Sequence, residues 1–379
     1  MIAPRPEVSG TPLAMHGGRL HRSDAAGAAP VVRHDFSVCL NAFGPPPVVV
    51  DAIRDSRPDE YPDPYCRAPR AAAAARWGRP VDELAFGAGA AELIYAVCFA
   101  YLRPGDHVLV DAPAFGEYAR AAALCGARTQ PVDAPVDVGD DVRFRAMIDA
   151  VRRTGPRLVF CAAPTSPFGT AIGRDALGEL AGACGAVGAL LVLDQAYDAF
   201  AAVPLGTPAL PGHRAVLHLR SLTKEYALAG VRAAFAIGPA EVVGAVERVR
   251  VPWSASNAAQ AAAVAALGDD GAAHAVRTVA ALRSEAVRLA AAFRHDGCEV
   301  RRSTTHFFVA RVGNAPRVRA ALLQGFGILV RDCSSFGLPE WMRVAARTAP
   351  ENDALLAALR TLPLERPSFA SSRQPHAND

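Results

Sequence analysis

Short apolar runs alternate with helical stretches through the middle of this chain, and this alternation limits its fold more than any other feature. The runs interpreted as strands are 107–111, 157–163, 189–194, 215–220 and 232–237. Helices are expected around them, at 90–102, 116–125, 142–153, 175–187 and 240–250. Strands that alternate with helices favour a mostly parallel sheet with helices on both faces. The sequence therefore predicts an α/β fold.

The pattern changes after residue 252. The elements expected there are helices at about 256–268 and 272–295, strand 306–312, helix 316–324, strands 328–331 and 342–346, and a helix that begins at the capping box Thr348-Ala349-Pro350-Glu351. A chain of 379 residues is long enough for two domains. We expect an N-terminal arm at 1–40, a large domain at 41–252, a smaller α+β domain at 253–365 and a disordered tail at 366–379.

The composition excludes several kinds of function. The arginines are scattered and the net charge is +3, so neither nucleic acid nor a membrane surface is an expected partner. The eight cysteines contain no Cys-x-x-Cys pair, and no histidine pair has zinc spacing. We therefore expect no metal site and a reducing cytoplasm. No apolar stretch is long enough to span a membrane.

Ligands of such sheets collect where the parallel strands end, and Lys224 follows the predicted strand 215–220. Lys224 is the only lysine in the chain, although lysines and arginines together number 40. An ammonium group can lose its proton near neutral pH and attack a carbonyl carbon to form a Schiff base, which a guanidinium cannot do. Chance in an Arg-rich composition explains a lone lysine equally well, so the neighbouring motifs decide between the two.

A glycine-rich loop precedes the helix expected at 90–102. Gly87 and Gly89 allow the backbone to approach a ligand closely, and the start of the helix offers free amides to a phosphate. Glu92 stands where a dinucleotide fingerprint needs a small residue, so that kind of site is excluded. A monophosphate site or a plain helix-start turn remains.

Asp194 ends the predicted strand 189–194. A carboxylate at the end of a buried run is costly unless it is paired or functional. It either caps the following turn or holds the protonated nitrogen of a ligand ring. In the second case Tyr197, three positions further on, is placed to hydrogen-bond a phenolic oxygen of the same ring.

Two further residues lie on either side of Lys224. Ser221 and Arg232 are candidates to bind a phosphate with the amides of Ala90 and Ala91, because arginine matches phosphate geometry. Phe115 is a candidate to stack on an aromatic ring, although a core position is the more common role for Phe. These features together describe a site for pyridoxal phosphate: a lysine amine, a carboxylate at the end of a strand, a group of phosphate-binding residues and an aromatic side chain that stacks on the ring.

The chain resembles the fold-type I pyridoxal phosphate enzymes of the class I/II aminotransferase superfamily, within the branch of histidinol-phosphate aminotransferase and threonine-phosphate decarboxylase. The resemblance covers about residues 35–362. It is carried by Glu60-Tyr61-Pro62-Asp63-Pro64, Gly87-Ala88-Gly89-Ala90-Ala91-Glu92, Pro113-Ala114-Phe115-Gly116, Asp194-Gln195-Ala196-Tyr197, Ser221-Leu222-Thr223-Lys224 with Gly230-Val231-Arg232, and Val330-Arg331-Asp332-Cys333. It implies a three-layer large domain with a mostly parallel sheet and a smaller α+β C-terminal domain.

The resemblance also implies roles for individual cofactor-binding residues. Lys224 would form the Schiff base, Asp194 would bind the pyridine nitrogen and Tyr197 would donate to the ring oxygen. The remaining cofactor contacts would be Phe115 on the ring and Ala90, Ala91, Ser221 and Arg232 around the phosphate.

Other implied roles concern the substrate and a second subunit. Tyr61 resembles the tyrosine that reaches the cofactor phosphate of the neighbouring subunit, which implies a homodimer with shared active sites. Arg331 and Arg343 match the two arginines that hold the carboxylate or phosphate of the substrate, and Asn41 is a further substrate-binding candidate.

The motif after the strand at 157–163 departs from the family pattern. The family has Asn-Asn-Pro-x-Gly, and its second Asn bonds the ring oxygen; here Pro164-Thr165-Ser166-Pro167-Phe168-Gly169 places Ser166 there. A hydroxyl is shorter than an amide, so Ser166 is expected to act directly or through water. Gln195 replaces the usual Glu, and Ala91 replaces the usual Asp.

The expected function is that of an aminotransferase with an anionic amino substrate, similar to histidinol-phosphate aminotransferase, and with 2-oxoglutarate or a similar keto acid as co-substrate. Lys224 would act as the general base. The alternative is a decarboxylase of a phosphorylated amino acid, such as threonine phosphate. The stretch that contains Arg331 is compatible with both activities. A third possibility, the effector-binding domain of a transcription regulator, is disfavoured because residues 1–40 are too short and too rich in Gly and Pro for a DNA-binding domain.

Overall fold

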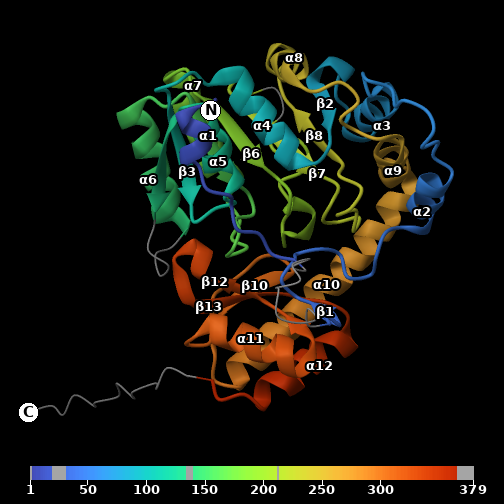
Figure 1. The fold of residues 1–379 in the computed structure, drawn as a ribbon, viewed down its shortest axis with the longest axis vertical. Coiled ribbons are helices and arrows are strands. Elements are labelled where there is room, and N and C mark those ends of the chain that lie inside the picture. The colour runs from blue at the N-terminus through green and yellow to red at the C-terminus, as the bar shows by residue number, and fades with distance from the viewer. Residues whose placement is uncertain (1, 19–30, 134–139, 211–212, 365–379) are drawn as a thin grey trace, which may run out of the picture.

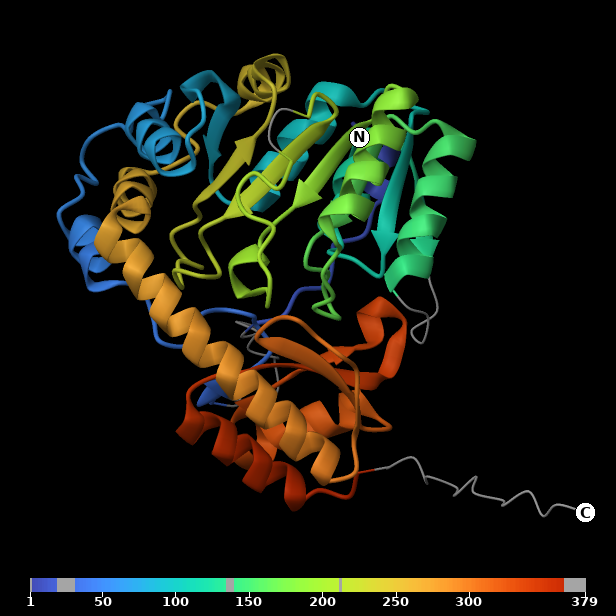
Figure 2. The same ribbon diagram turned by 180° about the vertical axis from the view of Figure 1, so that it is seen from behind.

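The structure is a computed structural model that describes residues 2–18, 31–133, 140–210 and 213–364. Figure 1 shows a large sheet with its helices at one end of the molecule and a smaller sheet with its own helices at the other. The long helix α10 (Asp269–His295) runs from one part to the other, as Figure 2 shows from behind. This arrangement confirms the predicted fold class. The domain limits stay a prediction, and the tail expected at 366–379 lies outside the described residues.

The large sheet has the strand order β2-β8-β7-β6-β5-β3-β4 within the described part of the chain. Its strands are β2 (Leu84–Gly87), β3 (His107–Ala112), β4 (Arg128–Asp133), β5 (Leu158–Ala162), β6 (Leu190–Asp194), β7 (Val216–Ser221) and β8 (Ala234–Ile237). Strands β4, β3, β5, β6 and β7 pair in parallel, whereas β8 runs antiparallel to both of its neighbours. The five expected strands are therefore all present in one sheet.

Several details of this sheet were not predicted. The edge strands β2 and β4 have no alternating apolar pattern long enough to reveal them. Pro131 lies in β4, which an edge position tolerates because the missing N–H faces away from the ladder. The run expected at 232–237 begins as a strand only at Ala234, because Arg232 has a φ of 64° and so leaves the extended region.

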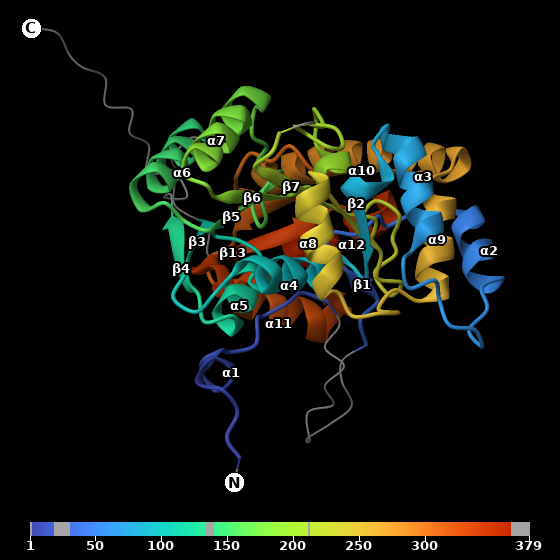
Figure 3. The same cartoon turned by 90° about the horizontal axis from the view of Figure 1, so that it is seen from above.

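Helices cover both faces of the large sheet. Figure 3 shows α4 (Ala90–Tyr101), α5 (Glu117–Leu124) and α8 (Ala240–Val249) on one side and α6 (Asp140–Thr154) and α7 (Arg174–Ala186) on the other. Each layer shares a buried apolar cluster with the strands. Helices α3 (Arg67–Trp77) and α9 (Asn257–Leu267) cover β2 and β8 near Phe86 and Phe235. The strands are apolar on both faces because both are covered.

The smaller sheet is antiparallel and has the order β12-β13-β10-β9. Its strands are β9 (Glu299–Val300), β10 (Phe307–Arg311), β12 (Arg331–Cys333) and β13 (Leu338–Ala345), and its helices are the second half of α10 with α11 (Ala315–Phe326) and α12 (Ala349–Arg360). The expected capping box at Thr348 and Glu351 is confirmed. The run expected at 328–331 divides into β11 (Ile328–Leu329) and β12.

The N-terminal segment joins both parts of the molecule. Helix α1 (Pro6–Gly10) lies beside α5, and β1 (His34–Asp35) pairs in parallel with β11. Phe36 is buried in the apolar core of the smaller sheet. Helix α2 (Pro47–Arg54) then packs on α9. The remaining short elements are the 3-10 turns Val81–Glu83, Asp198–Phe200 and Ser334–Phe336.

Candidate active site

A cavity of about 130 Å³ lies at the carboxyl ends of β5, β6 and β7. Every predicted cofactor contact except Tyr61 lines it, and so do Lys224, Asp194 and Tyr197. This is the edge of a parallel sheet where ligands bind, because the loops after the strands converge there. The structure therefore brings together residues that are more than 130 positions apart in sequence, from Ala90 to Arg232.

Lys224 extends into this cavity from the loop that follows β7. Its backbone carbonyl accepts a hydrogen bond from the amide of Asn41 at 2.9 Å, which fixes the loop. Burial lowers the pKa of Lys224, and the positive charges of Arg343 and Arg232 lower it further, against an opposing effect of Asp194. A lowered pKa leaves more of the amine neutral near pH 7, which is the form that attacks a carbonyl carbon.

Asp194, the last residue of β6, lines the cavity and is held there by two hydrogen bonds. Its Oδ2 accepts a hydrogen bond from the hydroxyl of Tyr118 at 2.6 Å, and its Oδ1 accepts one from the amide of Ala196 at 2.9 Å. Burial raises the pKa of Asp194, and these two hydrogen bonds oppose the rise. A buried carboxylate of this kind is stabilised by a cation, and a protonated ring nitrogen would be one.

The start of α4 and Arg232 form a cradle for an anion. Gly89 has a φ of 88°, and a Cβ atom built on it would lie 2.5 Å from Nη2 of Arg232. Only glycine therefore lets the guanidinium come so close to the helix start. Ala90 and Ala91, the first residues of α4, line the cavity beside Ser221. Free amides, a guanidinium and a hydroxyl around one gap fit a phosphate monoester.

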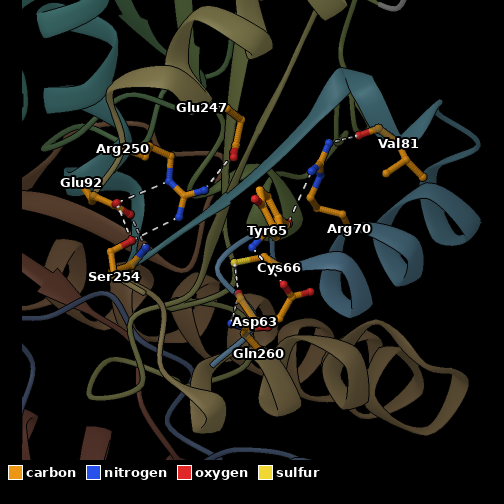
Figure 4. Close-up of polar contacts among 11 residues, drawn as sticks. Asp63, Tyr65, Cys66, Arg70, Val81, Glu92, Glu247, Arg250, Ser254 and Gln260 are labelled. Carbon is orange, nitrogen blue, oxygen red and sulfur yellow. Dashed lines mark hydrogen bonds and ion pairs between the residues drawn. The ribbon is translucent and has the colours of Figure 1, made fainter. Parts of the chain in front are cut away.

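Glu92 lies in the first turn of α4, and Figure 4 shows its contacts with Arg250 and Ser254. Its carboxylate accepts a hydrogen bond from the amide of Ala88 in the glycine-rich loop. It also accepts one from the hydroxyl of Ser254 at 2.8 Å and forms an ion pair with Arg250 at 3.4 Å. The acid that excludes a dinucleotide fingerprint thus has a role of its own, because it ties the loop to residues 250–254.

Arg331 and Arg343 are opposite each other on β12 and β13. Arg343 donates to the hydroxyl of Ser166 at 2.9 Å and to the carbonyl of Ser37 at 2.8 Å. Arg331 donates to the carbonyls of Met15 and His16 and to the hydroxyl of Ser335 at 2.6 Å. Burial and the charge of Arg343 lower the pKa of Arg331. Neither arginine forms an ion pair with a described carboxylate, so the pair favours an added anion.

Ser166 connects this arginine pair to the cavity. Its hydroxyl accepts the hydrogen bond of Arg343, so its own proton is available to another acceptor. Tyr197 also lines the cavity, and the centroid of its ring lies 4.9 Å from that of Phe307 and 5.9 Å from Nζ of Lys224. The bonds expected from Ser166 and Tyr197 to a ring oxygen stay predictions.

Like Arg331 and Arg343, the predicted residues Tyr61 and Asn41 do not line the cavity. Tyr61 is 85% exposed, and its ring packs on Trp253 with centroids 5.3 Å apart. Asn41 is buried, and its side-chain amide donates to the carbonyl of Glu225 at 2.8 Å and to the hydroxyl of Thr278 at 2.7 Å. These contacts give Asn41 a structural role next to Lys224, and they leave its amide protons engaged away from a substrate.

Sequence reasoning missed Tyr118 and Arg220. Tyr118 follows Phe115 by three residues in an Ala-rich helix, where an aromatic residue usually belongs to the core, and only its bond to Asp194 reveals its position. Arg220 immediately precedes the Ser221 motif and is buried. A buried arginine at the end of a strand is an available signal, because arginine is rarely buried without a partner.

Comparison with known proteins identifies the family. The pattern described as aminotransferase class I and II matches residues 35–359. The chain belongs to this family. This pyridoxal-phosphate-dependent aminotransferase is 35% identical over 333 residues to the histidinol-phosphate aminotransferase of Roseiflexus castenholzii, covering 84% of this chain and 87% of the relative. It is 32% identical over 379 residues to the histidinol-phosphate aminotransferase of a Jannaschia species, covering 96% and 99%.

Solved structures show the same fold. The crystal structure of histidinol-phosphate aminotransferase from Sinorhizobium meliloti, in complex with pyridoxal-5'-phosphate, matches with a TM-score of 0.80 at 24% identity and covers 94% of this aminotransferase and 96% of that chain. In the aminotransferase described here, none of the described helices combines the length and apolar character needed to cross a membrane. The described His, Cys, Asp and Glu side chains form no group of three that would hold a metal ion.

Proposed function

We propose that this aminotransferase moves the amino group of an anionic amino substrate, such as histidinol phosphate, to 2-oxoglutarate or a similar keto acid. The observation that carries the proposal is the pair Arg331 and Arg343 beside the Lys224 cavity, without a carboxylate partner among the described residues. Relatives named histidinol-phosphate aminotransferase support the same substrate class. They do not favour the decarboxylase alternative.

Pyridoxal phosphate in this cavity would supply a ring that takes up the electron pair released at the α-carbon of the substrate. The residues of the chain would hold that ring in place. Asp194 would keep a proton on the ring nitrogen, since a buried carboxylate fixed by two hydrogen bonds favours a cationic partner. Arg232 and the amides at the start of α4 would hold the phosphate, and Phe115 would cover one face of the ring.

Lys224 would serve in two protonation states. As a neutral amine, favoured by its lowered pKa, it would take the proton from the α-carbon of the substrate and return it at the next position. The loop contacts through Asn41 would keep Nζ within reach during this transfer. Tyr197 and Ser166 would donate hydrogen bonds to the ring oxygen.

We also propose a homodimer with shared active sites. An isolated chain leaves Tyr61 largely exposed and paired with Trp253, which is half-exposed. The loop that carries Tyr61 is fixed by Asn257, whose amide donates to the carbonyls of Arg57 and Glu60. A rigid, exposed aromatic pair is typical of a protein interface.

Initial-rate measurements with histidinol phosphate and 2-oxoglutarate would test the proposed substrates. We expect glutamate to form at a rate that saturates with both substrates, and Lys224→Arg to abolish it while leaving the fold intact by circular dichroism. Turnover that survives in Lys224→Arg would contradict the proposed role of the lysine. Glutamate formation with neutral amino acids but not with histidinol phosphate would contradict the anionic substrate.

A further inference from the structure

A second cavity, of about 400 Å³, is lined by Arg220 near the end of β7 and by Glu225, which directly follows Lys224. Neighbouring residues of a strand point to opposite faces, and the last two residues of β7 illustrate this. Ser221 lines the cofactor cavity, and Arg220 lines the second one, which we call the Arg220 cavity. Its other walls come from the ends of α3 and α9, from the first half of α10, and from Ala199, Pro204, Glu225 and Tyr226.

Positive charge dominates the Arg220 cavity. Arg76, Arg220 and Arg283 line it, whereas Glu225 is the one acid among the described lining residues. Glu225 is already paired with Arg220, with Nη2 and Oε2 2.7 Å apart. Neither Arg76 nor Arg283 forms an ion pair with a carboxylate in the part of the chain that the structure describes. Their two charges are therefore available to an anion.

The rest of the lining is apolar. Trp77 lies at the end of α3, and Val276 and Val279 lie on α10 together with alanines of the same helix. Trp77 is held by an edge-to-face contact with Phe235, with ring centroids 5.1 Å apart. Apolar walls with a few convergent charged groups are typical of small-molecule sites. The combination suits a ligand with an apolar body and one anionic end.

Arg220 connects this cavity to the catalytic residues. Its Nη1 donates to the carbonyl of Gln195 at 3.0 Å, and Gln195 directly follows Asp194. Its Nη2 donates to Glu225, which directly follows Lys224. Nε of Arg220 is buried and has no hydrogen-bond partner. An anion that competes for this guanidinium would loosen both segments at once.

We propose that the Arg220 cavity is a second binding site, for a small carboxylate or phosphate monoester with an aromatic or aliphatic body, and that its occupancy lowers turnover through Arg220. This inference does not rest on the substrate proposed above. It rests on the charges, the apolar walls and the two hydrogen bonds of Arg220.

Phenyl phosphate binding to the holoenzyme would test this site by calorimetry and by the Trp77 signal, which is the part of the change in tryptophan fluorescence that Trp77→Phe removes, since the chain has three tryptophans. Arg283→Ala removes one half-buried guanidinium from the cavity wall, and Arg277→Ala is a matched control because Arg277 lies on the same helix but not on that wall. We expect Arg283→Ala to weaken binding about tenfold, the loss of one charge-assisted contact, and Arg277→Ala to leave binding unchanged.

A third variant distinguishes binding in the Arg220 cavity from binding at the substrate site. Arg343→Gln weakens anion binding there and should leave the Trp77 signal intact. Loss of the Trp77 signal in Arg343→Gln, or equal affinities for Arg283→Ala and Arg277→Ala, would overturn the second site. Binding that leaves kcat unchanged in the wild-type enzyme would overturn the connection through Arg220.

Discussion

Replacing Tyr118 by phenylalanine would remove the side-chain hydrogen bond to Asp194 and keep the ring that packs on Phe160. The hydroxyl of Tyr118 lies 2.6 Å from Oδ2 of Asp194, and the two rings stack with centroids 5.0 Å apart. Both residues are buried, so water does not replace the lost donor freely. The variant therefore tests one interaction of the carboxylate that we assign to the ring nitrogen.

The size of the effect follows from the hydrogen bond. A hydrogen bond to a charged group contributes about 1.5–3 kcal/mol, and one pH unit corresponds to about 1.4 kcal/mol, so the pKa of Asp194 should rise by roughly one to two units. This bond lowers the pKa of Asp194 in the native enzyme, and its loss must raise it. Asp194 has to be ionised to hold the ring-nitrogen proton. When the solution is acidified, the activity of Tyr118→Phe should therefore fall at a higher pH than the activity of the native enzyme.

The pH dependence of kcat would measure this shift. We expect the acidic limb of Tyr118→Phe to move upward by about one to two units, with a lower kcat at pH 6 and a smaller loss at pH 8. Tyr95→Phe is the control, because Tyr95 also donates to a carboxylate at 2.6 Å, that of Glu117, outside the cavity. An unmoved acidic limb, or the same movement in both variants, would refute the role of Asp194.

Other variants test the cradle, the substrate site and the dimer. Gly89→Ala should weaken binding of the cofactor in an absorbance titration, because the new Cβ would lie 2.5 Å from Arg232. Gly105→Ala is the control: Gly105 has a similar φ of 90° but nothing near its Cβ position, so this variant should leave cofactor affinity unchanged. Arg343→Gln should raise KM for an anionic amino donor by about 30-fold or more in initial-rate assays, and an unchanged KM would exclude it from the substrate site. Tyr61→Phe should weaken cofactor binding several-fold while sedimentation still shows a dimer, and a monomeric native enzyme would contradict the shared site.

Much of the fold could be predicted because apolar periodicity is a local signal. The five central strands are apolar runs bounded by helical stretches, and each appears in the sheet. Edge strand β4 was not predicted because Pro131 and its polar neighbours lack that signal. The antiparallel direction of β8 was not predictable either, since strand direction depends on how the chain returns after Lys224 rather than on residues 234–237.

The candidate site was predictable where one residue type is chemically irreplaceable. Lys224 and Asp194 follow from what an amine and a buried carboxylate do, and both line one cavity. Tyr118 was not predictable, because its partner is 76 positions away. The role of Asn41 in holding the Lys224 loop also depends on contacts between distant segments. Such contacts are fixed by tertiary packing, which no short motif records.

An absorbance titration of the purified holoenzyme with histidinol phosphate tests the central claim most directly. We expect the visible band of the lysine-bound cofactor to disappear when histidinol phosphate is added and to return only when 2-oxoglutarate follows. Recovery of the band without a keto acid, together with release of carbon dioxide from a phosphorylated amino acid, would show decarboxylation instead. A native protein without any cofactor band, unchanged by added pyridoxal phosphate, would contradict the assignment of Lys224.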